Sequence, residues 1–179
     1  AAAIKDLHQR LGVLPVFGGY HVTQGTKNAL LNLGNGCYLE ILAADGDHSG
    51  VVPPRWMGVD LIKKPQITRW AIKSTDLPHA AAVLKNYQSA MGTIQGGERQ
   101  TKNGELLKWN MIMPLAKPAV EIIPFAVDWQ QSAAHPTDGL ADRCRLIHLE
   151  FTHPQPAEIT PVLDRLQLSA NLAAAAKIT

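Results

Sequence analysis

Residues 26–43, TKNALLNLGNGCYLEILA, carry the clearest structural pattern in the sequence. Two apolar runs, Thr26–Leu33 and Cys37–Ala43, flank the tripeptide Gly34-Asn35-Gly36. Glycine and asparagine tolerate the positive φ angles that tight hairpin turns require, and each run is long enough to form a strand. The stretch therefore predicts an antiparallel β-hairpin.

The segment before the hairpin predicts a helix and one more strand. Apolar residues recur at helical spacing through residues 4–11, and Gly12 ends the pattern as a C-cap does. A short apolar run at 14–17 then predicts a strand that ends in a turn at the double glycine 18–19. If one further strand precedes this helix, before residue 1, then residues 1–45 are predicted to belong to a βαβββ module.

The same order of elements returns after a linker at residues 45–65, which is rich in glycine and proline. The predicted elements are a strand at Gln66–Ser74, a helix at Leu77–Met91, the pair Thr93-Ile94 before a turn at Gly96-Gly97, and strands at Glu105–Met113 and Ala119–Trp129. Residues 66–129 therefore predict a second βαβββ module.

A partial third unit, residues 140–170, follows the second module. It is predicted as a strand at Arg143–Thr152 and a helix at Ile159–Leu168. The expected fold class is thus α+β: a single domain, 1–179, of paired βαβββ modules with an additional C-terminal βα unit.

Composition limits the partners that can be expected. The 17 Lys and Arg against 15 Asp and Glu leave a net charge of +2, too small to attract nucleic acid. The longest uncharged run, Leu11–Thr26, is interrupted by glycines and a proline, so no membrane helix is expected.

The spacing of Cys37 and Cys144 fits neither a disulfide framework nor a zinc motif. We therefore expect buried, reduced thiols and a cytoplasmic protein.

Several motifs suggest a family when they are taken together. They are Gly18-Gly19-Tyr20-His21, Gly25–Leu30, Tyr38–Ile41, Trp70–Lys73 with Thr75-Asp76-Leu77, Pro124-Phe125, Asp128-Trp129 and His135-Pro136. As a set they resemble the glyoxalase-like domain family of the vicinal oxygen chelate superfamily, which also holds glyoxalase I, extradiol dioxygenases and bleomycin-resistance proteins. The resemblance runs from about Gly12 to Leu168. It implies curled sheets that form an open cup with the site inside; a homodimer is the expected assembly.

Two glutamates occupy equivalent places in the two predicted modules. Glu40 shares a strand face with Tyr38 and Leu42, and Glu121 shares one with Ile123. A carboxylate among apolar residues is costly to bury unless it is paired, so such positions are candidate catalytic sites. We predict that both glutamates point into a common cavity; the alternative is a salt-bridged or edge-exposed glutamate.

Five further residues are candidates for ligand binding. They are Asn28 in the Gly-Thr-x-Asn segment, Trp70 and Trp109 as pocket walls, His148, and His21 at the mouth of the cup. Four of them have a plainer alternative: core packing for the tryptophans, a structural role for His148 and a surface turn for His21.

The resemblance also bears on metal binding. In metal-using members, one ligand comes from the first strand and one from the last strand of each module, which implies Glu40 and Glu121 as last-strand ligands. It places Trp70 where the second module should supply another ligand, and indole cannot coordinate a cation. We therefore expect no tightly bound metal or other cofactor; if a divalent metal does bind, Glu40 and Glu121 would hold it.

The sequence thus predicts a glyoxalase-like protein that binds or transforms a small organic molecule in a cup lined by Glu40 and Glu121. It leaves open whether the protein is an enzyme. The alternatives are a metal-dependent lyase, isomerase or dioxygenase-like enzyme acting on vicinal oxygens, a resistance-type protein that sequesters a small molecule, and a structural dimer. The sequence has no G-x-S-x-G, P-loop or dinucleotide-binding glycine motif, which disfavours triad hydrolysis, phosphoryl transfer and NAD chemistry.

Overall fold

The structure is a computed structural model that describes residues 2–47, 50–100, 104–115, 120–168 and 172–174. The chain divides into two compact units. The first comprises residues 1–65, 98–108 and 132–147, and the second comprises residues 66–97, 109–131 and 148–179. The boundary falls inside strands β5 (Ile94–Gln100) and β6 (Leu106–Ile112), which contribute residues to both units.

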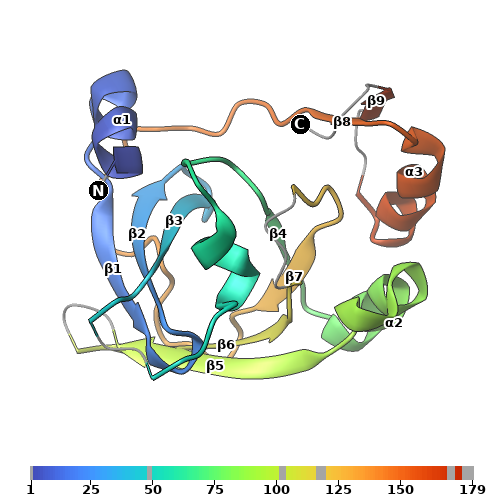
Figure 1. The fold of residues 1–179 in the computed structure, drawn as a ribbon, viewed down its shortest axis with the longest axis horizontal. Coiled ribbons are helices and arrows are strands. Elements are labelled where there is room, and N and C mark those ends of the chain that lie inside the picture. The colour runs from blue at the N-terminus through green and yellow to red at the C-terminus, as the bar shows by residue number, and fades with distance from the viewer. Residues whose placement is uncertain (1, 48–49, 101–103, 116–119, 169–171, 175–179) are drawn as a thin grey trace. The chain divides into compact units, whose positions relative to one another are not determined.

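The first unit contains the predicted hairpin. Helix α1 (Ala2–Leu11) leads into β1 (Val16–His21), β2 (Thr26–Asn32) and β3 (Tyr38–Ala44), which form an antiparallel sheet in the order β1-β2-β3 (Figure 1). Backbone hydrogen bonds from Leu33 to Cys37 and from Cys37 to Gly34 close the turn. The hairpin prediction is therefore confirmed.

The double glycines do not form the predicted turns. Gly18-Gly19 lies inside β1, where the register is irregular between Phe17 and Gly19, and Gly96-Gly97 lies inside β5. A Cβ atom on Gly18 would stand 2.4 Å from Asn28 Oδ1, and one on Gly97 would stand 2.5 Å from Trp109 Cε2. Each pair therefore contains a glycine because a side chain of the adjacent strand occupies the space beside the backbone.

The second unit has the predicted βαβββ order. Strand β4 (Ala71–Lys73) precedes helix α2 (Leu77–Tyr87), and β5, β6 and β7 (Phe125–Asp128) follow. The sheet order is β4-β7-β6-β5, with β4 parallel to β7 and β6 antiparallel to β7. Asp76 caps α2 by accepting a hydrogen bond from the His79 amide at 3.0 Å.

The strands predicted at 66–74 and 119–129 are longer than those observed, although Ala119 lies outside the described residues. Within the described residues, the two segments are joined before the ladder by isolated backbone bonds: Glu121 N donates to Thr68 O at 2.9 Å, and Phe125 N donates to Trp70 O at 3.3 Å. The apolar pattern extends beyond the continuous ladder because these residues pack without regular pairing.

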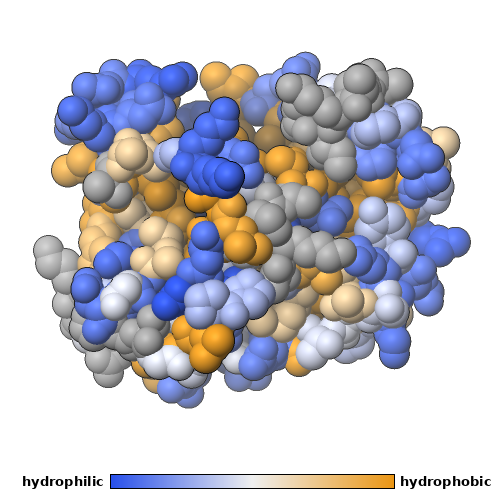
Figure 2. All heavy atoms as spheres, viewed as in Figure 1, coloured by the Kyte–Doolittle hydropathy of each residue, from blue (hydrophilic) through white to orange (hydrophobic). Residues whose placement is uncertain are grey.

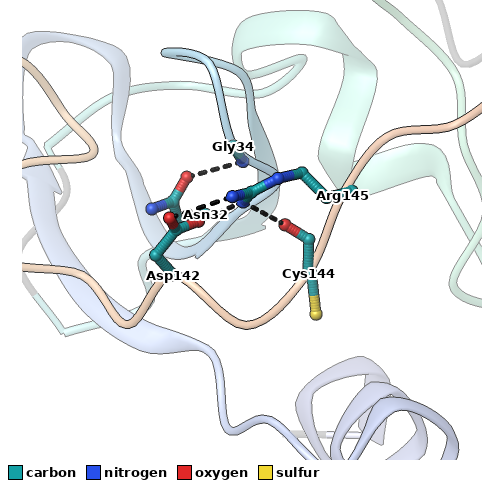
Figure 3. A network of polar contacts seen from close by, with 5 residues as sticks. All are labelled: Asn32, Gly34, Asp142, Cys144 and Arg145. Atoms are coloured by element: carbon teal, nitrogen blue, oxygen red, sulfur yellow. Dashed lines mark hydrogen bonds and ion pairs between the residues drawn. The ribbon is translucent and has the colours of Figure 1, made fainter.

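The strand predicted at Arg143–Thr152 is wrong over most of its length. Residues 143–150 have no regular structure, and only β8 (Phe151–His153) pairs, in parallel, with β9 (Leu172–Ala174). Ile147 is 93% exposed, so the apolar residues of this segment do not face a core. In the first unit the segment is held instead by Leu146 N, which donates to Leu33 O, and by Arg145, which bonds Asp142 and Cys144 O beside Gly34 (Figure 3).

The core of the second unit is made by α2, α3 (Pro156–Arg165) and the sheet. Its fully buried members include Leu84, Ile112, Ile122, Ile159 and Leu163. Burial of each such side chain contributes about 1.5–3 kcal/mol before entropy is counted. Helix α3 begins and ends three residues before the predicted helix, Ile159–Leu168, because Pro156 starts it.

The elements confirm the α+β class, whereas the cup shape stays a prediction. Hydrophobic and hydrophilic side chains alternate on the face drawn in Figure 2. Within the described residues, no helix has the length and apolar character needed to cross a bilayer.

Candidate ligand-binding site

The register of the first sheet places several polar side chains on one face. Leu30 pairs with Glu40 and Asn32 with Tyr38, and His21 pairs with Thr26. Paired residues of neighbouring strands project to the same face, and so does every second residue along a strand. The face therefore carries His21, Thr26, Asn28, Tyr38 and Glu40.

Glu40 is held in place by Asn28. The Asn28 side-chain amide donates to Glu40 Oε1 at 2.7 Å, and Asn28 itself is only 4% exposed. Burial raises the pKa of the Glu40 carboxyl, while the Asn28 hydrogen bond and the positive charge of Arg99 act in the opposite direction. With 29% of its side chain exposed, Glu40 is a shielded carboxyl that solvent still reaches.

His21 lies beside this carboxyl, in the strand rather than in a surface turn. It is 7% exposed; its Nδ1 is 3.1 Å from Thr26 Oγ1, and its Nε2 is 3.9 Å from Glu40 Oε1. The Trp56 ring meets the imidazole edge to face at 5.3 Å. Burial, and secondarily the charge of Arg99, lowers the pKa of His21 to about 4. The imidazole is therefore neutral near pH 7, and its contact with Glu40 is not an ion pair there.

Arg99 also belongs to this cluster, although it was not among the candidates predicted from the sequence. It comes from β5, is 8% exposed and donates from Nη1 to Gly18 O. Its charge opposes the rise in the pKa of Tyr38, which burial and then the negative charge of Glu40 raise. The sequence places Arg99 two residues after a double glycine, which favours an exposed turn, so no local signal marks it as buried.

The remaining candidates lie in the second unit. Glu121 is half-buried, and its Oε1 accepts a hydrogen bond from Ile123 N at 3.3 Å. Because Glu40 and Glu121 belong to different units, their common cavity stays a prediction. His148 is 59% exposed and lies 3.0 Å from the Glu150 carboxylate, so its binding role also stays a prediction.

The two tryptophan candidates make contacts typical of packing. Trp70 Nε1 donates to Ile122 O at 2.6 Å, and its ring lies 5.0 Å from that of Phe151 beside the buried core. Trp109 contacts Trp129, with ring centroids 5.4 Å apart. These contacts favour the core-packing interpretation for Trp70, whose only ring donor is already used.

Comparison with known protein families identifies the family of this chain. Its sequence matches the glyoxalase-like domain family over residues 1–167. The chain belongs to the glyoxalase-like domain family. No curated protein matches the sequence of this glyoxalase-like chain.

Two solved structures resemble the glyoxalase-like chain. A hypothetical protein from Staphylococcus aureus matches with a TM-score of 0.60 and 16% identity, over 93% of this chain and 79% of that chain. Methylmalonyl-CoA epimerase from Mycobacterium tuberculosis matches with a TM-score of 0.39 and 21% identity, over 71% of this chain and 78% of that chain. The first likeness shows a shared fold.

The side chains around Glu40 in this glyoxalase-like chain do not fit a divalent cation. Within the ranges that the structure describes, no three His, Cys, Asp or Glu side chains gather as a metal site. Among the described residues beside Glu40, His21 offers a neutral nitrogen ligand, whereas a catalytic zinc ion takes three protein ligands. The nearby guanidinium of Arg99 would also repel a second cation.

Proposed function

We propose that this glyoxalase-like protein binds a small organic molecule on the face of the β1-β2-β3 sheet, at Glu40. The observation that carries the proposal is the exposure of the Glu40 side chain, 29%, in a cluster whose other polar members His21, Asn28 and Arg99 are each below 10%. Glu40 is thus the group through which a ligand would meet the buried cluster.

The chemistry of the cluster suits hydrogen bonding to an organic ligand. Asn28 holds Oε1, while Oε2 has no hydrogen-bond donor within the described part of the chain. Burial raises the pKa of Glu40, so its carboxyl takes up a proton at a higher pH than an ordinary glutamate does. Oε2 accepts hydrogen bonds in the ionised form and can donate one in the protonated form. Trp56 and Tyr38 add aromatic surface beside it.

A thermal-shift screen of small neutral and charged organic molecules tests the proposal. Molecules that bind the folded state raise the melting temperature. We expect hits with the wild type and with Glu158→Gln, a matched control on the exposed surface of α3, and smaller shifts with Glu40→Gln. Hits that stabilise Glu40→Gln as much as the wild type, or a screen without hits, would contradict the proposal.

A second candidate function is proton transfer on the bound molecule. The observation that favours it is the 3.9 Å separation of His21 Nε2 and Glu40 Oε1, with the pKa of Glu40 raised and that of His21 lowered to about 4. His21 is neutral near pH 7 and can accept a proton, and Glu40, with its raised pKa, holds a proton up to a higher pH than an ordinary glutamate. Transfer through a bound metal finds no support in the donor set around Glu40.

Exchange with solvent deuterium separates binding from turnover. Hits from the screen are incubated with the protein in D2O, and the loss of their carbon-bound proton signals is followed by NMR. Loss that disappears in Glu40→Gln indicates an enzyme, whereas hits that bind without exchange indicate sequestration. Exchange that is unchanged in Glu40→Gln would contradict a proton-transfer role for this carboxyl.

A further inference from the structure

Arg99 is a buried cation that forms no ion pair with an Asp or Glu side chain of the described residues. Its side chain is 8% exposed, and within the described residues no Asp or Glu oxygen lies at ion-pair distance from it. The residues outside the described ranges contain no Asp or Glu side chain. Glu40 lies near enough for each charge to shift the pKa of the other, but the two do not form a direct ion pair. Buried charges are ordinarily paired, so we expect an anion to bind the Arg99 guanidinium.

Two other basic side chains near this sheet, unlike Arg99, form ion pairs with carboxylates. Lys27 lies 3.6 Å from Asp45 and 3.7 Å from Asp47, and Arg55 forms an ion pair with Asp60. Those side chains therefore have their counter-charges within the protein. Among the described residues, the hydrogen-bond acceptor of Arg99 is the carbonyl oxygen of Gly18, which is neutral.

We infer that Arg99 binds the carboxylate group of the small molecule; this inference rests on the proposed function. A guanidinium carries five N–H donors in a planar fork that matches a carboxylate with two parallel hydrogen bonds. One nitrogen, Nη1, bonds Gly18 O, which leaves the other side of the fork for a ligand.

A monoanion suits the site better than a phosphate dianion. Arg99 supplies one positive charge and His21 is neutral near pH 7, so these two side chains offer no second positive charge for a dianion. The raised pKa of Tyr38 keeps its hydroxyl protonated, so that group remains a donor. The ligand class is therefore a small organic carboxylate.

Paired probes test this inference. Acetate, glycolate, benzoate and phenylacetate are each titrated against the corresponding neutral amide, at constant ionic strength, with amide NMR shifts as the readout; inorganic phosphate is a further probe. We expect the carboxylates to bind the wild type more tightly than the amides and to shift the signals of Gly18 and Glu40. Arg99→Gln should raise their Kd by about 10- to 100-fold, since charge-assisted hydrogen bonds are lost.

Two further variants serve as controls for Arg99→Gln. Arg10→Gln, which removes an arginine paired with Asp6 on the exposed surface of α1, should bind as the wild type does. Arg99→Lys retains the charge but lacks the fork, so it should bind carboxylates about tenfold more weakly even where Arg99→Gln does not fold.

Several outcomes would overturn the inference. Equal binding of acids and amides, carboxylate binding that survives in both Arg99 variants, stronger binding of phosphate, or no carboxylate binding would each do so. The proposed function would still stand if neutral molecules bound the wild type and lost affinity in Glu40→Gln. It would fail together with the inference if neither charged nor neutral molecules bound.

Discussion

The Asn28 side chain donates a hydrogen bond of 2.7 Å to Glu40 diagonally across the β2–β3 pair, since Asn28 lies opposite Leu42 and Glu40 lies opposite Leu30. Both residues are on the same face because their strands are paired in this register. A register slip of one residue would move one of them to the other face. The placement of the carboxyl therefore follows from the hairpin, and from the space that Gly18 leaves for the Asn28 amide.

Gly18→Ala should displace Asn28. The new Cβ atom would stand 2.4 Å from Asn28 Oδ1 and 3.1 Å from Leu30 Cδ1, so the Asn28–Glu40 hydrogen bond should weaken or break. We expect a loss of about 1–3 kcal/mol in the free energy of unfolding, measured by urea denaturation. Gly46→Ala is the matched control, because a Cβ there meets nothing within 4 Å. Equal stability of the two variants would show that Asn28 adapts without cost.

His21 should make the protein less stable in acid. Its pKa falls from 6.5 to about 4 on folding, so between these values the unfolded chain binds a proton that the folded chain does not. The contribution is fully present above pH 6.5 and is lost as the pH falls toward 4, up to about 3 kcal/mol. Urea denaturation of the wild type and His21→Asn at pH 7 and pH 4 measures it, and the variant should show the smaller decrease. Parallel decreases would mean that His21 does not titrate differently on folding.

Gly34→Ala and Gly36→Ala should cost nearly the same. Both residues have positive φ, +77° and +70°, which costs an alanine about 1–2 kcal/mol. A Cβ on Gly34 would also meet Arg145 Nη1 at 2.5 Å (Figure 3), but that side chain is 54% exposed and can move. The exposed ion pair with Asp142 that it would give up is worth little. A difference above about 1 kcal/mol by chemical denaturation would show that Arg145 anchors the turn more firmly than an exposed pair should.

Trp70→Phe should destabilise the second unit. The substitution keeps an aromatic ring against Phe151 but removes the hydrogen bond to Ile122 O. An acceptor left without its donor in a buried place costs about 1–3 kcal/mol. Unfolding followed by circular dichroism should report this loss without any ligand present. An unchanged midpoint would instead support the pocket-wall interpretation of Trp70.

Most of the local structure could be predicted from patterns of neighbouring residues. Alternation around Gly34-Asn35-Gly36 was sufficient for the hairpin, and helical spacing with capping residues was sufficient for α1 and for the start of α2, because these patterns act over a few neighbouring residues. Helix α2 ends at Tyr87 rather than at the predicted Met91, which lies in a separate short helix. The limit to neighbouring residues also explains why turns were wrongly predicted at 18–19 and 96–97. A double glycine favours a turn when only its neighbours are considered, whereas here it makes room for a side chain of another strand.

The cluster around Glu40 was decided by tertiary structure. Asn28 and Glu40 were candidates from the sequence, but the burial of His21 and the presence of Arg99 depend on contacts between distant segments. Arg99 meets Gly18 across 81 positions of the chain, and Trp56 from a separate short helix covers His21. Desolvation and the field of a neighbouring charge, which set the pKa values of Glu40 and His21, depend on what surrounds each group in space, and residue order alone does not contain that information.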